Sequence, residues 1–208
     1  MKKFVLTLAI SMMAVVMFAQ NITTASASFK SISEYYGTLK SYECEFEITV
    51  EKQETAGHLS YKSPDLLRMD YTSPVNQVIC FNGDTITLYL SDVPVVLQQQ
   101  VDSEGSGVSI ATAHGLSLMS RYYTVRYENG QAAEPLENGS DEMVIKYVLD
   151  RKSASEAFRY IKVAVNESTK LIRRMEAVTP KGEILIFNFF DYKLNPDAYN
   201  KVIQAYQQ

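Results

Sequence analysis

The sequence predicts a mainly β protein: one antiparallel sheet of about nine or ten strands, with one helix before the strands and one helical insertion among them. Three observations lead to this fold class. Short apolar segments follow one another with turn residues between them, and one segment alternates between apolar and acidic residues. The 208 residues, 46% hydrophobic and 21% charged, suit one globular domain and exclude a disordered chain. Antiparallel sheets of this size curl or close.

The first segment is typical of an export signal. Two lysines precede the apolar run over residues 4–19, which is short for a membrane span of about 20 residues. The small residues of Ala25-Ser26-Ala27 favour cleavage after this triplet, whereas cleavage after Ala19 would place Met17 at the outer recognition position. We therefore expect a signal peptide over residues 1–27, with an uncleaved membrane anchor as the alternative.

The rest of the chain, residues 28–208, is expected to form a single exported, soluble domain that starts at Ser28. No cysteine follows the apolar run directly, so the sequence offers no attachment point for the lipid of a bacterial lipoprotein. A formal net charge of -4 and the lack of a basic cluster argue against nucleic-acid binding.

A short helix and an amphipathic strand open this domain. Apolar residues recur at helical spacing over residues 29–39, and Ser31 with Glu34 has the spacing of a capping box. Over residues 43–51 the period changes to two, with acidic residues between apolar ones. This alternation predicts a strand with one dry face and one solvated, acidic face.

Short strands continue on both sides of a glycine-rich interruption. Asn82-Gly83 predicts a hairpin, because a tight turn needs residues that accept positive φ. Glycines and scattered apolar residues over 102–121 predict a loosely amphipathic helix, and a polar loop follows over 128–141. The tail after Asn195 is compatible with a short helix. The further predicted strands are 58–62, 66–71, 77–81, 85–90, 95–101, 143–150, 158–165, 171–178 and 183–190.

Patterns for catalysis or metal binding are weak. His58 and His114 are the two histidines, and neither has another ligand type at short spacing, so the sequence does not favour a general base or a zinc site. The segment 107–111 around Ser109 approaches the nucleophile elbow G-x-S-x-G but ends in alanine. We predict no catalytic residue, no metal and no cofactor.

The two cysteines, Cys44 and Cys80, fall on apolar positions of the first and fourth predicted strands. In a sequential sheet with a strand spacing of ~4.8 Å they would lie ~14 Å apart. That distance is too long for a disulfide, so we expect two unpaired buried thiols.

The most unusual feature of the chain is its apolar sheet surface. One or two short helices cover little of a sheet this large, so either the sheet closes over packed side chains or it leaves a cavity for an apolar ligand. Periodicity alone does not decide between them. The apolar positions on neighbouring strands are Leu67, Met69, Tyr71, Ile79, Phe81, Ile86, Leu88 and Leu90.

Two stretches carry a resemblance to a known family. Residues 57–74, GHLSYKSPDLLRMDYTSP, lead into residues 77–89, QVICFNGDTITLY, and residues 171–191 look like a late hairpin. They resemble the LolA-type outer-membrane lipoprotein carriers. The family pattern is a glycine, a strand, a lysine-rich approach to proline, F-R-W-x-Y-x-x-P, a second strand, D-G and an aromatic strand ending in tyrosine.

The resemblance implies an incomplete antiparallel β-barrel of about nine to eleven strands, with a helical lid over a hydrophobic cavity for acyl chains. It implies a monomeric periplasmic carrier of acylated lipoproteins, which is not an enzyme. Cargo would come from an inner-membrane ABC transporter and pass to an outer-membrane acceptor. The implied cavity or core positions are Leu67, Met69, Tyr71, Ile79, Phe81, Ile86 and Leu88, and the implied lid residues are Leu118 and Met119.

The chain departs from the family pattern at several positions. Ser63 stands where an arginine closes the lid, and Met69 and Thr87 stand where tryptophans are usual. The phenylalanine-rich strand expected after Asn195 is not evident. An alternative hypothesis is an envelope-sensing module that binds a lipid or a partner peptide on the same fold, and a third is an exported hydrolase.

Overall fold

The computed structural model describes residues 23–90, 95–100 and 112–194. Residues 1–22 of the predicted signal peptide, Ser109 and the tail from Asn195 lie outside the described residues. The helices are α2 (Ala25–Thr38) and α3 (Ala113–Tyr122). The strands are β1 (Ser41–Val50), β2 (Gln53–Lys62), β3 (Leu66–Ser73), β4 (Val75–Phe81), β5 (Thr85–Leu90), β6 (Val95–Gln100), β7 (Tyr123–Tyr127), β8 (Glu134–Pro135), β9 (Met143–Arg151), β10 (Tyr160–Asn166), β11 (Ile172–Val178) and β12 (Ile184–Lys193).

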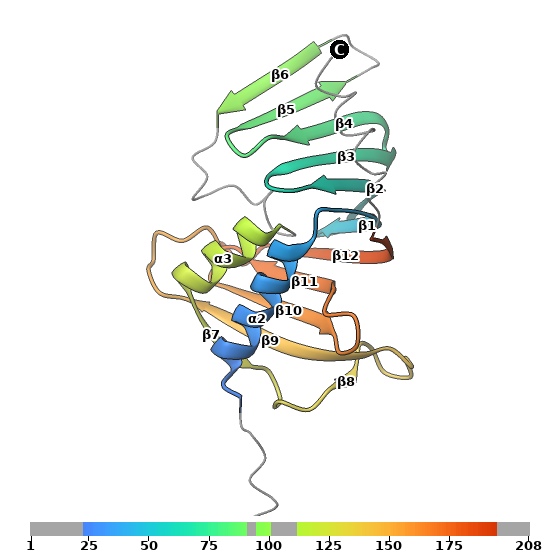
Figure 1. The fold of residues 1–208 in the computed structure, drawn as a ribbon. Helices are drawn as coiled ribbons and strands as arrows, with labels where there is room; N and C mark the ends of the chain where they lie inside the picture. Colours follow the sequence, from blue (N-terminus) through green and yellow to red (C-terminus); the bar gives the residue numbers. More distant parts are fainter. Residues whose placement is uncertain (1–22, 91–94, 101–111, 195–208) are drawn as a thin grey trace, which may run out of the picture.

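All the strands belong to one open, twelve-stranded antiparallel sheet (Figure 1). The order is β6-β5-β4-β3-β2-β1-β12-β11-β10-β9-β7, with β8 paired to β9 off this path. No described strand joins β6 to β7, so the barrel is incomplete. Both helices pack on the same face of the sheet. This confirms the predicted fold class.

The sheet consists of two sequential meanders joined edge to edge. Strands β1 to β6 form the first meander and β9 to β12 the second, and each strand pairs with its neighbour in sequence. The junction is the long-range pair β1 and β12, in which Phe46 lies opposite Phe189. The meanders follow from short turns, such as the β4–β5 turn, where the Asn82 side chain accepts hydrogen bonds from the Asp84 and Thr85 amides and Gly83 has a φ of +95°.

Both predicted helices are present, with different boundaries. Helix α2 begins at Ala25, four residues before the predicted start, because Thr24 provides its N-cap. Helix α3 is capped by Thr112, whose hydroxyl accepts the Gly115 amide at 3.0 Å. Within the described ranges, neither helix has both the length and the apolar content needed to cross a membrane.

The predicted amphipathic strand is β1. Its apolar side chains at Tyr42, Cys44 and Phe46 are buried, and the glutamates between them point to the opposite face. Cys44 and Cys80 are both buried and unpaired, as predicted, because two strands separate β1 from β4.

Two strands were not predicted. β7 begins directly where α3 ends, so no turn residue marks it, and β8 has only two residues beside the end of β9. β2 also begins at Gln53 and not at His58, because the β1–β2 hairpin turns at Glu51 and Lys52, with a φ of +57° at Glu51 and no glycine or asparagine to mark the turn.

Gly57 has a packing role in the centre of β2. A Cβ atom at this position would lie 2.2 Å from the Asp70 carbonyl oxygen and 2.7 Å from the ring of Phe46. The Phe46 ring occupies this space and packs edge-on against Tyr71, with a centroid separation of 5.2 Å. The glycine is therefore required because the Asp70 carbonyl of β3 and the Phe46 ring of β1 leave no room for a side chain.

Candidate functional site

The candidate site is the inner face of the sheet, which we define as the face that packs against α2 and α3. Residues directly opposite each other in an antiparallel pair point to the same face. Helix residues Phe29, Ile32 and Met119 share one buried cluster with Leu59 and Met69, so this row of the sheet belongs to the inner face. The row crosses the sheet through Cys44, Leu59, Met69, Ile79, Leu88 and Leu97.

The structure brings the predicted sheet residues together on this inner face. Leu67, Met69 and Tyr71 of β3 lie opposite Phe81, Ile79 and Gln77 of β4. Ile86 and Leu88 of β5 continue the same two rows as Phe81 and Ile79. Several of these residues are also part of the core, so their ligand-binding role stays a prediction.

The side chains of this row become more exposed from β3 toward the edge strand β6. Met69 is 9% exposed, Ile79 and Leu88 are half-buried, and Leu97 at the edge strand is 55% exposed. We call β4, β5 and β6 the arm, and the remaining strands the covered part. Figure 1 shows both helices across the half of the sheet that β9 to β12 form, and no described helix across the arm.

The arm is uncharged where it is least covered, and the central row of its inner face is apolar. None of the residues of β5 and β6 carries a charge. Leu97 lies opposite Leu88, and on the outer face Val96 (54% exposed) lies opposite Tyr89 (44% exposed). Apolar surface left open at one sheet end is typical of a site for an apolar ligand or partner.

Helix α3 places one of the two predicted lid residues in the core. Met119 is 7% exposed, and Leu116, one turn earlier, is fully buried. Leu118 is half-buried and lies outside the core cluster, because it projects from another side of the helix. Sequence reasoning missed Leu116, although its spacing of three residues from Met119 marks the same helix face.

A buried tyrosine cluster under α2 was also missed. The rings of Tyr36, Tyr42 and Tyr192 lie close together, with centroid separations of 6.1 Å and 5.7 Å to Tyr42. The Ile172 amide donates to the Tyr36 hydroxyl at 2.9 Å, and the Tyr192 hydroxyl donates to the Ile172 carbonyl at 2.9 Å. The only sequence signal is composition, with 14 tyrosines and no tryptophan.

Burial changes the acid–base properties of this cluster. Loss of solvation raises the pKa of Tyr36, Tyr42 and Tyr192 above the ordinary phenol value, and it raises the pKa of the neighbouring Cys44 thiol. These groups are therefore neutral at neutral pH. Their side chains pack in the core between α2 and the sheet.

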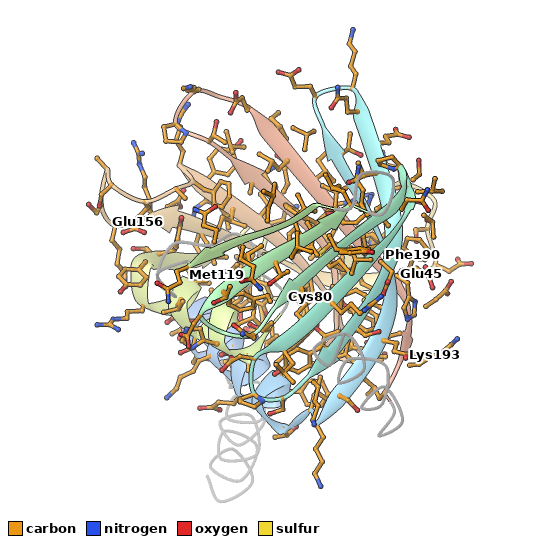
Figure 2. All side chains as sticks on the ribbon, turned by 90° about the horizontal axis from the view of Figure 1, so that it is seen from above. Glu45, Cys80, Met119, Glu156, Phe190 and Lys193 are labelled. Atoms are coloured by element: carbon orange, nitrogen blue, oxygen red, sulfur yellow. The ribbon has the colours of Figure 1, made fainter. Side chains whose placement is uncertain are left out.

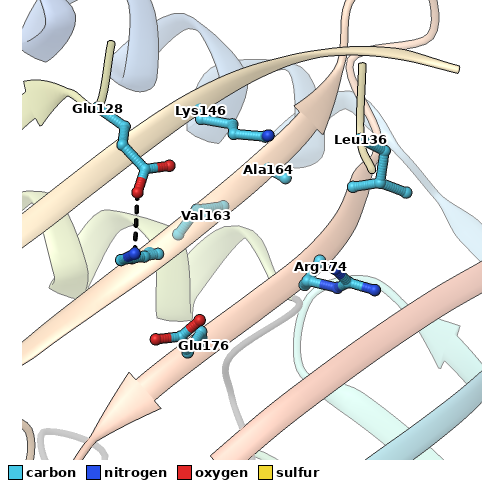
Figure 3. Close-up of a pocket in the computed structure, with 8 residues that line it drawn as sticks. Glu128, Leu136, Lys146, Val163, Ala164, Arg174 and Glu176 are labelled. Atoms are coloured by element: carbon cyan, nitrogen blue, oxygen red, sulfur yellow. Dashed lines mark ion pairs between the residues drawn. The ribbon is translucent and has the colours of Figure 1, made fainter. Parts of the chain in front are cut away.

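The outer face has a different chemistry. A pocket of about 250 Å³ lies over β9, β10 and β11 and is lined by both acids and bases (Figure 3). Lys162 pairs with Glu128 at 2.9 Å, which raises the pKa of Lys162, and Lys146 pairs with Glu134 at 3.4 Å. Arg174 pairs with Glu137. The cations are already neutralised, and none of the predicted site residues lines this pocket.

One histidine of the neighbouring strand β2 lies against the acidic face of β1. His58 Nδ1 lies 2.9 Å from Glu45 Oε1, and His58 Nε2 lies 3.7 Å from Glu43 Oε2. Figure 2 shows Glu45 beside Phe190 on the face away from Met119, in agreement with the β1–β12 pairing. Among the described residues, no group of three or more histidines, cysteines and acids is placed to hold a metal ion. His114 is exposed on α3.

The chain is similar in sequence to known proteins. The outer-membrane lipoprotein carrier protein of Pseudomonas paraeruginosa is 27% identical over 144 residues, which cover 69% of this chain and 63% of that protein. The chain thus spans less than two thirds of that relative's length. The protein of the same name from Haemophilus ducreyi is 26% identical over 181 residues, covering 83% and 79% of the two chains.

Solved structures share the fold at low identity. An uncharacterized conserved protein from Thermus thermophilus has a TM-score of 0.54 and 12% identity, over 81% of this chain and 86% of that chain. The Pseudomonas aeruginosa MucA/MucB complex structure has a TM-score of 0.51 and 12% identity, over 81% of this chain and 56% of that chain. These similarities support the sheet-and-helix architecture alone.

A family model matches most of the chain, and it confirms the resemblance inferred from residues 57–89. The model is described as outer membrane lipoprotein carrier protein LolA, and it matches residues 37–204. The match includes every described strand, helix α3 and the end of α2. The chain therefore belongs to the LolA family of outer membrane lipoprotein carrier proteins.

Proposed function

We propose that the protein is a periplasmic lipoprotein carrier that holds acyl chains on the inner face where the covered part meets the arm. The observation that carries the proposal is the burial gradient from Met69 through Ile79 and Leu88 to Leu97. A continuous apolar row that begins in the core and ends in solvent lets an alkyl chain bury its length without an ionic partner.

The energetics suit transient binding. Each CH₂ group removed from water contributes about 0.8 kcal/mol, so affinity depends on how much of the chain the arm covers. A shift of α3 or of the arm would change that area without breaking a covalent bond. Carriage of this kind needs no catalytic group.

The proposed binding residues are those on the inner face and on α3. Tyr71, Ile79, Ile86 and Leu88 are half-buried and are the positions available for contact, together with half-buried Leu118 on α3.

The more deeply buried members of the predicted set would form the floor of the site. Leu67 and Phe81 are each 1% exposed, and Met69 and Met119 are 9% and 7% exposed. The two methionines adapt readily to chains of different shape, because their side chains are unbranched and flexible.

The proposed route follows from this role. Cargo would be received from an inner-membrane ABC transporter and delivered to an outer-membrane acceptor, with the protein in the periplasm between them. The relatives named as outer-membrane lipoprotein carriers support the carrier role from which this route is inferred. The closing of the lid would differ from the family pattern at Ser63, whose amide donates to the Lys40 carbonyl at 2.9 Å.

A matched pair of substitutions on β5 tests the binding face. Leu88 points to the inner face and Thr87, the preceding residue, points to the outer face opposite Cys80. The protein is isolated without detergent from the periplasm of cells that overproduce a triacylated lipoprotein. Native mass spectrometry then measures the stoichiometry of the complex between the protein and the lipoprotein. We expect a one-to-one complex for the unmodified protein and for Thr87→Glu, and free protein for Leu88→Glu.

The outcome distinguishes a binding face from a general loss of structure. Circular dichroism melting of both variants verifies that each remains folded. Equal loss in the two variants, or a complex retained in folded Leu88→Glu, would contradict the inner face as the binding site. Free protein in every form, including the unmodified one, would contradict carriage itself.

A further inference from the structure

The first turn of α2 is held by residues that precede the predicted mature start. The Thr24 hydroxyl accepts a hydrogen bond from the Ala27 amide at 3.2 Å and so caps the helix. One residue earlier, the Thr23 carbonyl accepts a hydrogen bond from the Tyr127 hydroxyl of β7 at 3.0 Å. The chain upstream of Ser28 therefore both caps the helix and ties it to the sheet.

Packing fixes the same turn to the core. Ala25 is 8% exposed and belongs to the buried cluster together with Phe29. The Ser28 and Tyr147 hydroxyls are 2.7 Å apart, and the Phe29 ring meets the Tyr147 ring edge-on at 5.5 Å. Removal of Ala25 would expose this corner of the interface between α2 and β9.

Cleavage after Ala27 would damage this arrangement in two ways. It would remove the N-cap and the first three residues of the helix, including buried Ala25. It would also turn the Ser28 amide, which now donates to the Thr24 carbonyl at 2.9 Å, into a positively charged amine. A positive charge at a helix N-terminus is unfavourable because it faces the positive end of the helix dipole.

We propose that the export peptidase cleaves the bond between Ala19 and Gln20, and that the mature protein keeps the α2 cap. Water adds across this peptide bond, which leaves a carboxylate on Ala19 and an amine on Gln20. Alanine suits the position before the cut, while Met17 is larger than the outer position prefers. The proposal revises the expected start at Ser28 and requires only that the chain is exported.

The first residue of the exported protein is the direct test. The full chain, with its own first segment, is produced in a Gram-negative host, and the periplasmic product is analysed by intact mass and by sequencing of its N-terminal peptide. We expect the chain to begin at Gln20, with or without cyclisation of the glutamine. A start at Ser28, any other first residue, or an uncleaved chain would overturn the proposal.

Two blocking substitutions locate the bond independently. Glutamine is too large for the position before the cut, and Ala27 is exposed, so Ala27→Gln leaves the folded helix undisturbed. We expect Ala19→Gln to accumulate precursor and Ala27→Gln to be processed as the unmodified chain is. The reverse pattern would overturn the proposal.

The structural reason for the proposal has its own test. Proteins that begin at Gln20 and at Ser28 are purified and melted side by side, together with Thr24→Ala in the longer form. We expect Thr24→Ala to lower Tm by about 2–4 °C, and the form that starts at Ser28 to melt at least about 4 °C lower than the longer form. Equal Tm values for the two lengths would overturn the role of residues 23–27 in anchoring α2.

Discussion

The covered part and the arm are built from the same alternating strands, but they differ in what lies on their inner face. In the covered part, α2 and α3 bury side chains such as Met175 and Leu149 completely. In the arm, the corresponding face of β5 and β6 remains half-buried at Leu88 and 55% exposed at Leu97. Strand pattern alone therefore does not decide burial, because the helices cover only part of the apolar face.

This difference separates stability from the proposed function. The covered part holds the fold, since its core apolar and tyrosine side chains are almost wholly removed from solvent. The arm contributes less to stability and keeps apolar area available for a ligand. Substitutions of one chemical type should therefore have different effects in the two parts.

The largest expected effect separates two leucine truncations. Leu149→Ala in the covered part should lower the free energy of unfolding by about 2–5 kcal/mol, because it leaves a cavity in a close-packed core. Leu97→Ala in the arm should change it by less than about 0.5 kcal/mol. Urea unfolding followed by circular dichroism measures both. Equal losses would mean that the arm is as closely packed as the core.

A smaller effect is expected within the covered part. Gly57→Ala should cost about 1–3 kcal/mol, because the new methyl group collides with the Asp70 carbonyl and the Phe46 ring. Gly37 of α2 has no atom within 4 Å of the added Cβ, so Gly37→Ala should instead stabilise the protein by about 0.5–1 kcal/mol. Opposite signs in the same urea assay are the diagnostic result, and a neutral Gly57→Ala would contradict the close approach of the strands.

The smallest expected effect depends on pH. Burial raises the pKa of Tyr42 in the native state, so the native protein holds this proton more tightly than the unfolded chain. The resulting stabilisation is complete below about pH 10 and is lost as pH rises above it, by up to about 1.4 kcal/mol per pH unit for each such group.

Substitution of single phenols tests this assignment. Tyr42→Phe should flatten the fall in stability between about pH 9 and pH 11, because the substitution removes the buried phenol whose pKa is raised. The measurement is urea unfolding at a series of alkaline pH values. A slope insensitive to Tyr42→Phe would mean that alkaline unfolding starts elsewhere.

Much of the sheet was predictable because local residues determine it. Alternation between apolar and acidic residues marked β1, and Asn82-Gly83 marked the hairpin of β4 and β5. No local pattern marked the pairing of β1 with β12, because residues far apart in the chain meet there. β7 was missed because it follows α3 without a turn residue.

The candidate site was predictable as a set of residues but not as a surface. Leu67, Ile79 and Leu88 were predicted as cavity or core positions from the family resemblance, and the strand register places them on one face. Parity could not say which of them the helices cover, since that depends on where α2 and α3 cross the sheet. For the same reason Leu116 and the tyrosines under α2 were not anticipated.

The central claim is that acyl chains bind the inner face of the arm, and site-specific photocrosslinking tests it most directly. A photoreactive residue is introduced at Leu88, on the inner face, or at the adjacent Tyr89, on the outer face. Cells producing each form with an acylated lipoprotein are irradiated. We predict a lipoprotein adduct linked through the acyl chain from position 88 and none from position 89. Equal crosslinking from both positions, or adducts from position 89 alone, would contradict the account.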